Sequence, residues 1–237
     1  MTVVAKEEIE GIGVEFESKK AQEIVNWALE EYDPNIALSC SFGAEDVVLV
    51  DMIARIRPGS RVFTLDTDFL FPETHDVIKR IKEKYPIALE VYTSDMTIEE
   101  MEKKYGKELY STDPDLCCQI RKLQPLQKAL SGLTAWITGL RRDQAPTRAN
   151  TKKVELDSKF GLVKINPLAD WSSDQVWAYI RENKVPYNVL HDQNYPSIGC
   201  APCTKPVKPG EDPRTGRWAG KGKTECGLHP ADNPGKK

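Results

Sequence analysis

Six cysteines carry the most distinctive chemistry in this sequence, because four of them occur in two pairs. Cys117 and Cys118 are adjacent, and Cys200 and Cys203 have C-x-x-C spacing. Paired thiols in a protein that keeps its cysteines reduced bind structural zinc or an iron–sulfur cluster. Adjacent side chains converge poorly on one zinc ion, whereas an iron–sulfur cube offers each thiolate its own iron. The spacing therefore favours a cluster, with structural zinc as the alternative.

The other two cysteines, Cys40 and Cys226, are isolated in the sequence. Cys40 ends a short apolar run and is expected to be a small buried side chain. Cys226 lies in K-T-E-C-G-L-H, close to His229 and downstream of Arg214 and Arg217. Nearby cations lower the pKa of a thiol and favour its nucleophilic thiolate. Cys226 is therefore a candidate nucleophile, and an incidental tail thiol is the alternative.

Composition excludes several classes of protein. The 237 residues suffice for one large domain, or one domain with appendages, and its substantial core. A formal net charge of −3 argues against a dedicated nucleic-acid binder. The first residues have no basic segment followed by an apolar one, and no apolar run reaches the about 20 residues that cross a bilayer. We expect a cytoplasmic protein with reduced thiols and no membrane or nucleic-acid partner.

The pattern of apolar runs predicts the fold class. Buried strands are expected at 35–40, 61–65, 88–92 and 133–138. Helices are expected at 18–32, capped by Ser18, and at 45–56, 72–85 and 170–182. Residues 154–165, which include Gly161, resemble a hairpin. Strands that alternate with helices in this way predict an α/β fold with a doubly wound, mostly parallel sheet.

Polar groups follow three of these strands, at ends that a parallel sheet brings to one edge. Residues 39–46 place hydroxyls and a glycine before a helix N-terminus, where anions bind; an ordinary capped turn is the alternative. Residues 64–68 add a hydroxyl and carboxylates, and 139–142 with Arg148 add guanidinium groups. A solvated basic loop would explain the last stretch alone. Together, the three strand ends favour a nucleotide or phosphate-like ligand.

Known phosphate-binding motifs do not describe this edge. The turn at 39–46 is neither G-x-x-x-x-G-K-S/T nor G-x-G-x-x-G. It also lacks the S-G-G-x-D-S turn of ATP-pyrophosphatase-type ligases. The nucleotide would therefore be held in another way.

Taken together, these stretches resemble the assimilatory adenylylsulfate (APS) reductases of the phosphoadenylylsulfate (PAPS) reductase family. The matching motifs are S-F-G-A-E-D at 41–46, L-D-T at 65–67, F-P-E-T at 71–74, C-C-x-x-R-K at 117–122, G-L-R-R at 139–142, C-x-x-C at 200–203 and K-T-E-C-G-L-H at 223–229. They extend over nearly the whole chain, from Ser39 to Pro230. The two cysteine pairs combined with the E-C-G-L-H tail make the resemblance specific.

The resemblance implies an adenine-nucleotide-alpha-hydrolase-like fold and one 4Fe–4S cluster per subunit. It assigns the cluster to Cys117, Cys118, Cys200 and Cys203. It implies that the Cys226 thiolate attacks the sulfur of APS, releases AMP and leaves an enzyme S-sulfocysteine. Thioredoxin or glutaredoxin would then reduce this adduct to sulfite for sulfate assimilation and cysteine biosynthesis.

The same resemblance implies the substrate contacts and the division of the chain. The phosphosulfate would be surrounded by Lys122, Arg214, Arg217 and His229. The nucleotide would be lined by Ser39, Ser41, Phe42, Gly43, Leu65, Asp66, Thr67, Gly139, Arg141 and Arg142. We expect a nucleotide-binding reductase domain over 1–195, followed over 196–237 by a segment with two cluster cysteines and a mobile catalytic tail.

Substrate and assembly are left open by the sequence. Alternatives are a PAPS reductase, an enzyme that uses both substrates, or a zinc-stabilised nucleotide-binding protein without redox chemistry; a homo-oligomer is an option. The family usually has glycine where this chain has Asp68. A carboxylate there would repel a ribose 3′-phosphate, so we hypothesise that Asp68 favours APS.

Overall fold

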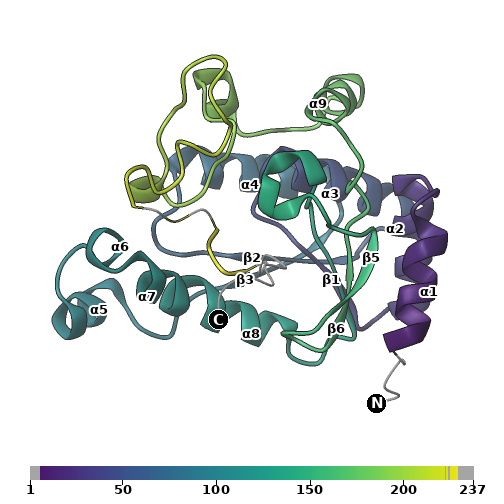
Figure 1. Cartoon of the computed structure of the whole chain (residues 1–237), viewed down its shortest axis with the longest axis horizontal. Coiled ribbons are helices and arrows are strands. Elements are labelled where there is room, and N and C mark those ends of the chain that lie inside the picture. The colour runs from purple at the N-terminus through teal and green to yellow at the C-terminus, as the bar shows by residue number, and fades with distance from the viewer. Residues whose placement is uncertain (1–5, 222, 224, 229–237) are drawn as a thin grey trace.

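The central element of the fold is a six-stranded sheet with the order β3-β2-β1-β4-β6-β5 in the computed structural model, which describes residues 6–221, 223 and 225–228 (Figure 1). The strands are β1 (Ile36–Ser39), β2 (Arg61–Leu65), β3 (Ala88–Tyr92), β4 (Ala135–Ile137), β5 (Val154–Asp157) and β6 (Leu162–Ile165). Every neighbouring pair is parallel except β5 and β6, which form an antiparallel hairpin at one edge. The predicted doubly wound, mostly parallel sheet is confirmed.

Helices cover both faces of the sheet (Figure 1). They are α1 (Lys6–Phe16), α2 (Ala21–Tyr32), α3 (Ala44–Ile56), α4 (Pro72–Lys84), α5 (Ile98–Tyr105), α6 (Leu109–Thr112), α7 (Pro114–Cys118), α8 (Gln124–Leu130) and α9 (Ser173–Glu182). Short 3₁₀ turns lie at Arg142–Gln144, Pro146–Arg148, Val189–Gln193 and Ala201–Cys203, and a π-helical turn at Gln119–Leu123 joins α7 to α8. None of the helices in the described ranges is both long and apolar enough to span a membrane.

Two hydrophobic cores form because strand side chains alternate between the faces of the sheet. Ala135 and Ile137 point to the core beneath α2, α3, α4 and α9, whereas Trp136 points to the core beneath α8. In the same way, Val62 packs in the first of these cores and Phe63 in the second. Burial on both faces explains why these strands are continuous apolar runs.

Most element boundaries agree with the sequence prediction. Strands 61–65 and 88–92 are predicted residue for residue, and the hairpin within 154–165 is confirmed. The predicted cap of α2 is wrong. Ser18 donates its hydroxyl to the carbonyl of Glu15, and α2 begins only after Lys20, whose N–H is accepted by Glu23 at 2.7 Å.

Candidate active site

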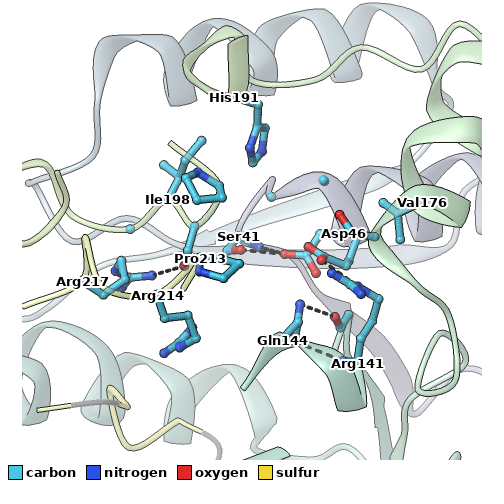
Figure 2. Close-up of a pocket in the computed structure, with 18 of the residues that line it drawn as sticks. Ser41, Asp46, Arg141, Gln144, Val176, His191, Ile198, Pro213, Arg214 and Arg217 are labelled. Atoms are coloured by element: carbon cyan, nitrogen blue, oxygen red, sulfur yellow. Dashed lines mark hydrogen bonds and ion pairs between the residues drawn. The ribbon is translucent and has the colours of Figure 1, made fainter. Parts of the chain in front are cut away.

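A cavity of about 840 Å³ lies at the carboxyl ends of β1, β2 and β4, the edge at which open α/β sheets bind ligands (Figure 2). Of the residues predicted to form the site, those that line it are Ser39, Ser41, Gly43, Leu65, Thr67, Lys122, Gly139, Arg141, Cys200, Arg214, Arg217 and Cys226. Phe42, Asp66 and Arg142 are not among the lining residues, and His229 lies outside the described residues. One concave site thus unites three strand ends with the C-terminal tail.

The turn after β1 is held by a buried carboxylate. Asp46 accepts hydrogen bonds from the backbone N–H of Ser41 at 2.6 Å and from its hydroxyl at 2.7 Å. Phe42 adopts a positive φ of 59° and is buried in the core, so it supports the turn from behind. Burial raises the pKa of Asp46 to about 6, although the Ser41 hydrogen bonds oppose it. The N-terminus of α3 therefore faces the cavity and could accept an anion.

Gly139 allows β4 to approach that helix closely. A Cβ at Gly139 would lie 2.9 Å from Cβ of Glu45 and would collide with the carboxylate of Asp46. The G-L-R-R motif thus begins with glycine for a packing reason that the sequence alone did not reveal.

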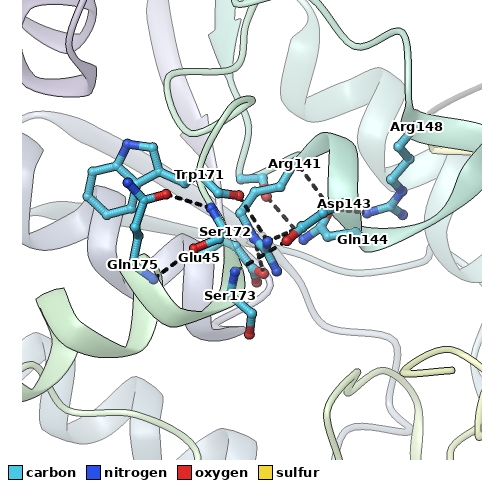
Figure 3. A network of polar contacts seen from close by, with 10 residues as sticks. Glu45, Arg141, Asp143, Gln144, Arg148, Trp171, Ser172, Ser173 and Gln175 are labelled. Carbon is cyan, nitrogen blue, oxygen red and sulfur yellow. Dashed lines mark hydrogen bonds and ion pairs between the residues drawn. The ribbon is translucent and has the colours of Figure 1, made fainter. Parts of the chain in front are cut away.

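The two arginines of G-L-R-R point in different directions. Arg141 is buried and donates to Glu45 at 2.8 Å, to the carbonyl of Trp171 at 3.1 Å and to Asp143 (Figure 3). Arg142 instead contacts Glu17 at 2.6 Å and the carbonyl of Thr151 at 2.7 Å, away from the cavity. Arg141 therefore joins the loop to α3 beside the cavity, and Arg142 joins it to the N-terminal region.

Cys226 reaches the cavity from the tail and lies among cations. Burial by itself raises the pKa of this thiol, but the charges of Lys122 and Arg217 and the backbone N–H of Leu228 outweigh it, so the pKa lies below its ordinary value. Leu228 packs against the core beneath α8. A half-buried thiol with a lowered pKa, facing an open cavity, has the properties of an activated nucleophile.

The four paired cysteines share one neighbourhood. Cys117 and Cys118 end α7 and are buried, as is Cys200, whose sulfur lies 3.2 Å from the hydroxyl of Thr67. Burial, together with the charges of Cys118, Cys200 and Cys203, raises the pKa of Cys117 to about 12. No group of three or more His, Cys, Asp or Glu side chains in the described part of the chain has the geometry of a site for one metal ion. The structure thus places four thiols close enough for their charges to act on one another.

Two residues at the site, of which only His191 lines the cavity, were not found by reasoning from the sequence. Glu225, inside the E-C-G-L-H motif, is bound by Arg148, which lies 77 residues away in the sequence, and by Arg214, which lies 11 residues away. His191 points into the cavity (Figure 2), with its buried Nε2 making no hydrogen bond to the described residues. Burial lowers the pKa of His191. Of these two, only Glu225, which directly precedes the candidate nucleophile Cys226, offered a signal in the sequence.

Comparison with known proteins decides the family. Residues 35–206 match the phosphoadenosine phosphosulfate reductase domain. The chain belongs to the phosphoadenosine phosphosulfate reductase family. The resemblance inferred from the sequence motifs is therefore confirmed.

Relatives within this family are similar over almost the whole chain. Adenosine 5'-phosphosulfate reductase of Staphylococcus epidermidis is 50% identical over 227 residues, which cover 95% of this chain and 93% of the relative. Adenosine 5'-phosphosulfate reductase 2 of Bacillus subtilis is 51% identical over 208 residues, covering 87% and 88%.

Solved structures agree with the fold. Phosphoadenylyl-sulfate (PAPS) reductase from Candida auris, in complex with phosphate, matches with a TM-score of 0.76 and 33% identity over 86% of this chain and 98% of that chain. FMN adenylyltransferase from Candida glabrata has a TM-score of 0.58 at 16% identity, over 79% of this chain and 61% of that chain. The second likeness concerns the fold alone.

Proposed function

We propose that this protein reduces adenylylsulfate to sulfite and AMP in sulfate assimilation and cysteine biosynthesis, with Cys226 as the nucleophile. The observation that carries the proposal is the position of Cys226 in the cavity, beside Lys122 and Arg217 and with a lowered pKa. Relatives that are about 50% identical to this chain are named adenosine 5'-phosphosulfate reductase, and they support adenylylsulfate as the substrate. The family makes the protein an oxidoreductase that acts on a sulfur group.

The proposed reaction has two steps. The Cys226 thiolate attacks the sulfur of the sulfate group, an S–S bond forms, the bond from sulfur to the phosphate oxygen breaks, and AMP leaves with that electron pair. A thiolate of an external dithiol protein such as thioredoxin or glutaredoxin then attacks the Cys226 sulfur and releases sulfite. Its second thiol resolves the mixed disulfide, so the dithiol gives up the two electrons that sulfur gains.

An external dithiol is required because this chain offers no evident second thiol. Cys40 borders the cavity but is only 2% exposed, and burial raises the pKa of its thiol well above the ordinary value. The paired cysteines are assigned to a cofactor. Reduced dithiol proteins are available in the cytoplasm, where we place this protein.

Electrostatics in the cavity would favour the first step. Attack by a thiolate on an anionic sulfonyl group is self-repelling, and preorganised cations offset that repulsion as charge builds on the departing phosphate. Lys122 and Arg217 lie where they act on both the thiolate and an anion in the cavity. Burial tends to lower the pKa of Lys122, but the charges of Cys200 and Cys226 outweigh it and the pKa is raised, so this lysine is a cation at neutral pH.

The four paired thiols fit a 4Fe–4S cluster. Cys117, Cys118 and Cys200 are buried, Cys203 is partly so, and their charges act on one another, which is a donor set of four soft ligands. When bound, the cluster would supply a rigid anionic anchor beside the cavity. Cys203→Ser should lose iron and acid-labile sulfide, and zinc in place of iron in the purified protein would refute the assignment.

A sulfonate adduct on Cys226 is the decisive test of function. The protein, incubated with adenylylsulfate and no dithiol, should gain the mass of one SO₃ group, located on Cys226 by peptide mapping. Cys226→Ser should form no adduct and release no sulfite, yet still bind AMP and retain iron. Cys40→Ala, which removes a buried thiol that also borders the cavity, should still form the adduct. Turnover by Cys226→Ser would refute the proposal.

A further inference from the structure

The described residues of the C-terminal tail are 223 and 225–228. Among them, Glu225 makes the most extensive ionic contact. Its Oε1 accepts from Nε of Arg148 at 2.9 Å and its Oε2 from Nη2 of the same arginine at 2.8 Å. Oε2 also accepts from Nη2 of Arg214 at 3.0 Å, and Oε1 from the hydroxyl of Thr147 at 3.1 Å. The carboxylate is therefore gripped by a planar bidentate pair and two further donors, a strong and directional arrangement.

This ion-pair cluster is largely removed from water. The side chains of Glu225, Arg148 and Arg214 are only 12%, 13% and 14% exposed. Burial tends to raise the pKa of Glu225, but hydrogen bonds and charges from the two arginines outweigh it and lower that pKa. Burial and the nearby charge of Arg148 lower the pKa of Arg214 to about 10, and Glu225 opposes this. Glu225 thus compensates two guanidinium groups that repel each other, and removing it would take away that compensating charge.

Other contacts of the tail are more exposed. Lys223, whose own side chain is only 9% exposed, pairs with Asp115, whose side chain is 86% exposed. Lys159 donates to the carbonyl of Gly227 at 2.9 Å from an exposed position. Exposed ion pairs contribute little because water screens them. Within the described tail residues, Glu225 is therefore the principal ionic anchor, and it directly precedes Cys226.

We propose that Glu225 is a positioning residue, whose ion pairs with Arg148 and Arg214 dock the tail on the cavity and hold Cys226 beside Lys122 and Arg217. This inference rests on the proposed role of Cys226 and adds the means by which that thiol is placed. It also divides the cations of the cavity. Arg148 and Arg214 hold the tail, whereas Lys122 and Arg217 act on the thiol.

A competing explanation makes the opposite kinetic prediction. If the Glu225 carboxylate merely occupied the place of a substrate anion, its removal would lower KM and leave kcat unchanged. If it positions Cys226, its removal should lower kcat, because the thiol is then displaced from the reacting sulfur. We expect Glu225→Gln, in the iron-loaded enzyme, to lose roughly tenfold to a hundredfold in kcat, the effect of a buried charge-assisted contact.

The matched control is Lys159→Gln, which removes a tail hydrogen bond made from an exposed side chain. It should change kcat less than about threefold, in keeping with the small worth of an exposed contact. Glu225→Asp, which keeps the charge on a shorter side chain, should fall between wild type and Glu225→Gln.

Alkylation of Cys226 by iodoacetamide provides a readout that needs no turnover. Its rate as a function of pH reports the thiolate, and peptide mass spectrometry assigns it to Cys226. The negative charge of Glu225 raises the pKa of Cys226, so loss of that charge alone would shift the midpoint to lower pH. Loss of docking takes the thiol away from Lys122 and Arg217 and shifts the midpoint to higher pH. We expect the upward shift in Glu225→Gln; a downward shift or none would overturn the proposal.

An exchange of charges tests the partner. Glu225→Arg combined with Arg148→Glu should recover part of the kcat lost by Glu225→Arg alone, and no recovery would overturn the assignment of Arg148 as the partner.

The alkylation shift also separates the two proposals. If it occurs while Cys226→Ser remains active, the docking stands and the proposed function fails. If Cys226→Ser is inactive and no shift occurs, the function stands and the docking fails.

Discussion

Gly199 and Arg217 pack so closely that a Cβ on the glycine would lie 2.6 Å from Cζ of the arginine. The Arg217 guanidinium stacks 4.6 Å from the ring centre of Trp218 and donates to the hydroxyl of Ser197 at 3.2 Å. It lines the cavity from this position (Figure 2). The glycine before the C-x-x-C pair therefore makes room for a cation that acts on Cys226.

Gly199→Ala should displace Arg217 and weaken its action on the cavity. We expect kcat/KM for adenylylsulfate to fall roughly tenfold to a hundredfold, the worth of one charge-assisted contact. Gly11→Ala is the control, because a Cβ at Gly11 meets nothing within 4 Å on an exposed helix face. Steady-state kinetics at matched iron content would test this, and equal activity of both variants would contradict it.

The sheet was predictable because its strands are short apolar runs, although the edge strand at 88–92 is only partly buried and its Val91 is 56% exposed. Residues 61–65 and 88–92 stand out as short apolar runs between turn residues, and both boundaries agree with the structure. Helix α1 was missed because Gly11 and Gly13 weaken its helical propensity. A Cβ on Gly13 would lie 2.7 Å from the carbonyl oxygen of Val154, so a contact with β5 requires that glycine.

The site was predictable to the level of motifs and less so to the level of side chains. The carboxyl ends of parallel strands meet at one edge, so residues 39–46 and 139–142 were expected to meet, and they do. Nothing in Arg141-Arg142 says which guanidinium faces the cavity, because their partners Glu45 and Glu17 are distant in the sequence. Such long-range ion pairs depend on tertiary structure alone.

Asp46 should make stability depend on pH. Its folded pKa of about 6 is above the about 3.9 of an unfolded Asp, so the cost of its buried charge is absent below pH 4 and complete above pH 6. Stability from this group is thus lost as pH rises between those values, by about 3 kcal/mol at 1.4 kcal/mol per pH unit. Asp46→Asn still accepts a hydrogen bond from Ser41 but carries no charge. Its free energy of unfolding relative to wild type should therefore rise by about 3 kcal/mol from pH 4 to pH 7. Urea unfolding at both pH values measures it; a constant difference would refute the prediction.

Asp51 should be important for stability rather than catalysis. It is fully buried on α3 and accepts hydrogen bonds from Tyr85 at 2.9 Å and Tyr179 at 2.7 Å, with Arg55 at 2.8 Å. Asp51→Ala would leave two tyrosine hydroxyls unpaired where α4 and α9 meet α3, so we expect a loss of about 2–4 kcal/mol in the free energy of unfolding. Asp76→Ala, which removes an exposed ion pair with Arg80, should lose less than about 1 kcal/mol. Similar urea midpoints for the two variants would contradict this account.

Asp68 makes an ion pair that offers an alternative to its hypothesised role in substrate choice. Its Oδ2 lies 2.6 Å from Nη1 of Arg121, whose side chain is 1% exposed, and Asp68 is not among the residues that line the cavity. Nε and Nη2 of Arg121 make no hydrogen bond to the described residues, and its guanidinium lies 6.0 Å from the ring centre of Phe69. The carboxylate therefore compensates a buried cation. This role explains an acidic residue at position 68 without any repulsion of a ribose phosphate.

Asp68→Gly should accordingly lower stability and leave the ratio of kcat/KM for APS and PAPS unchanged. Leaving Arg121 unpaired is costly, whereas glycine relieves the positive φ of 60° at this position, so the net loss should be roughly 1–3 kcal/mol. Asp68→Asn separates charge from backbone, because it removes the charge and keeps a side chain at that φ. If the carboxylate repels the 3′-phosphate, both variants should shift the ratio toward PAPS by a similar factor. If the carboxylate serves Arg121, both variants should lose stability and neither should change the ratio. Asp68→Asn should lose more stability than Asp68→Gly, because asparagine does not relieve the strain of the positive φ.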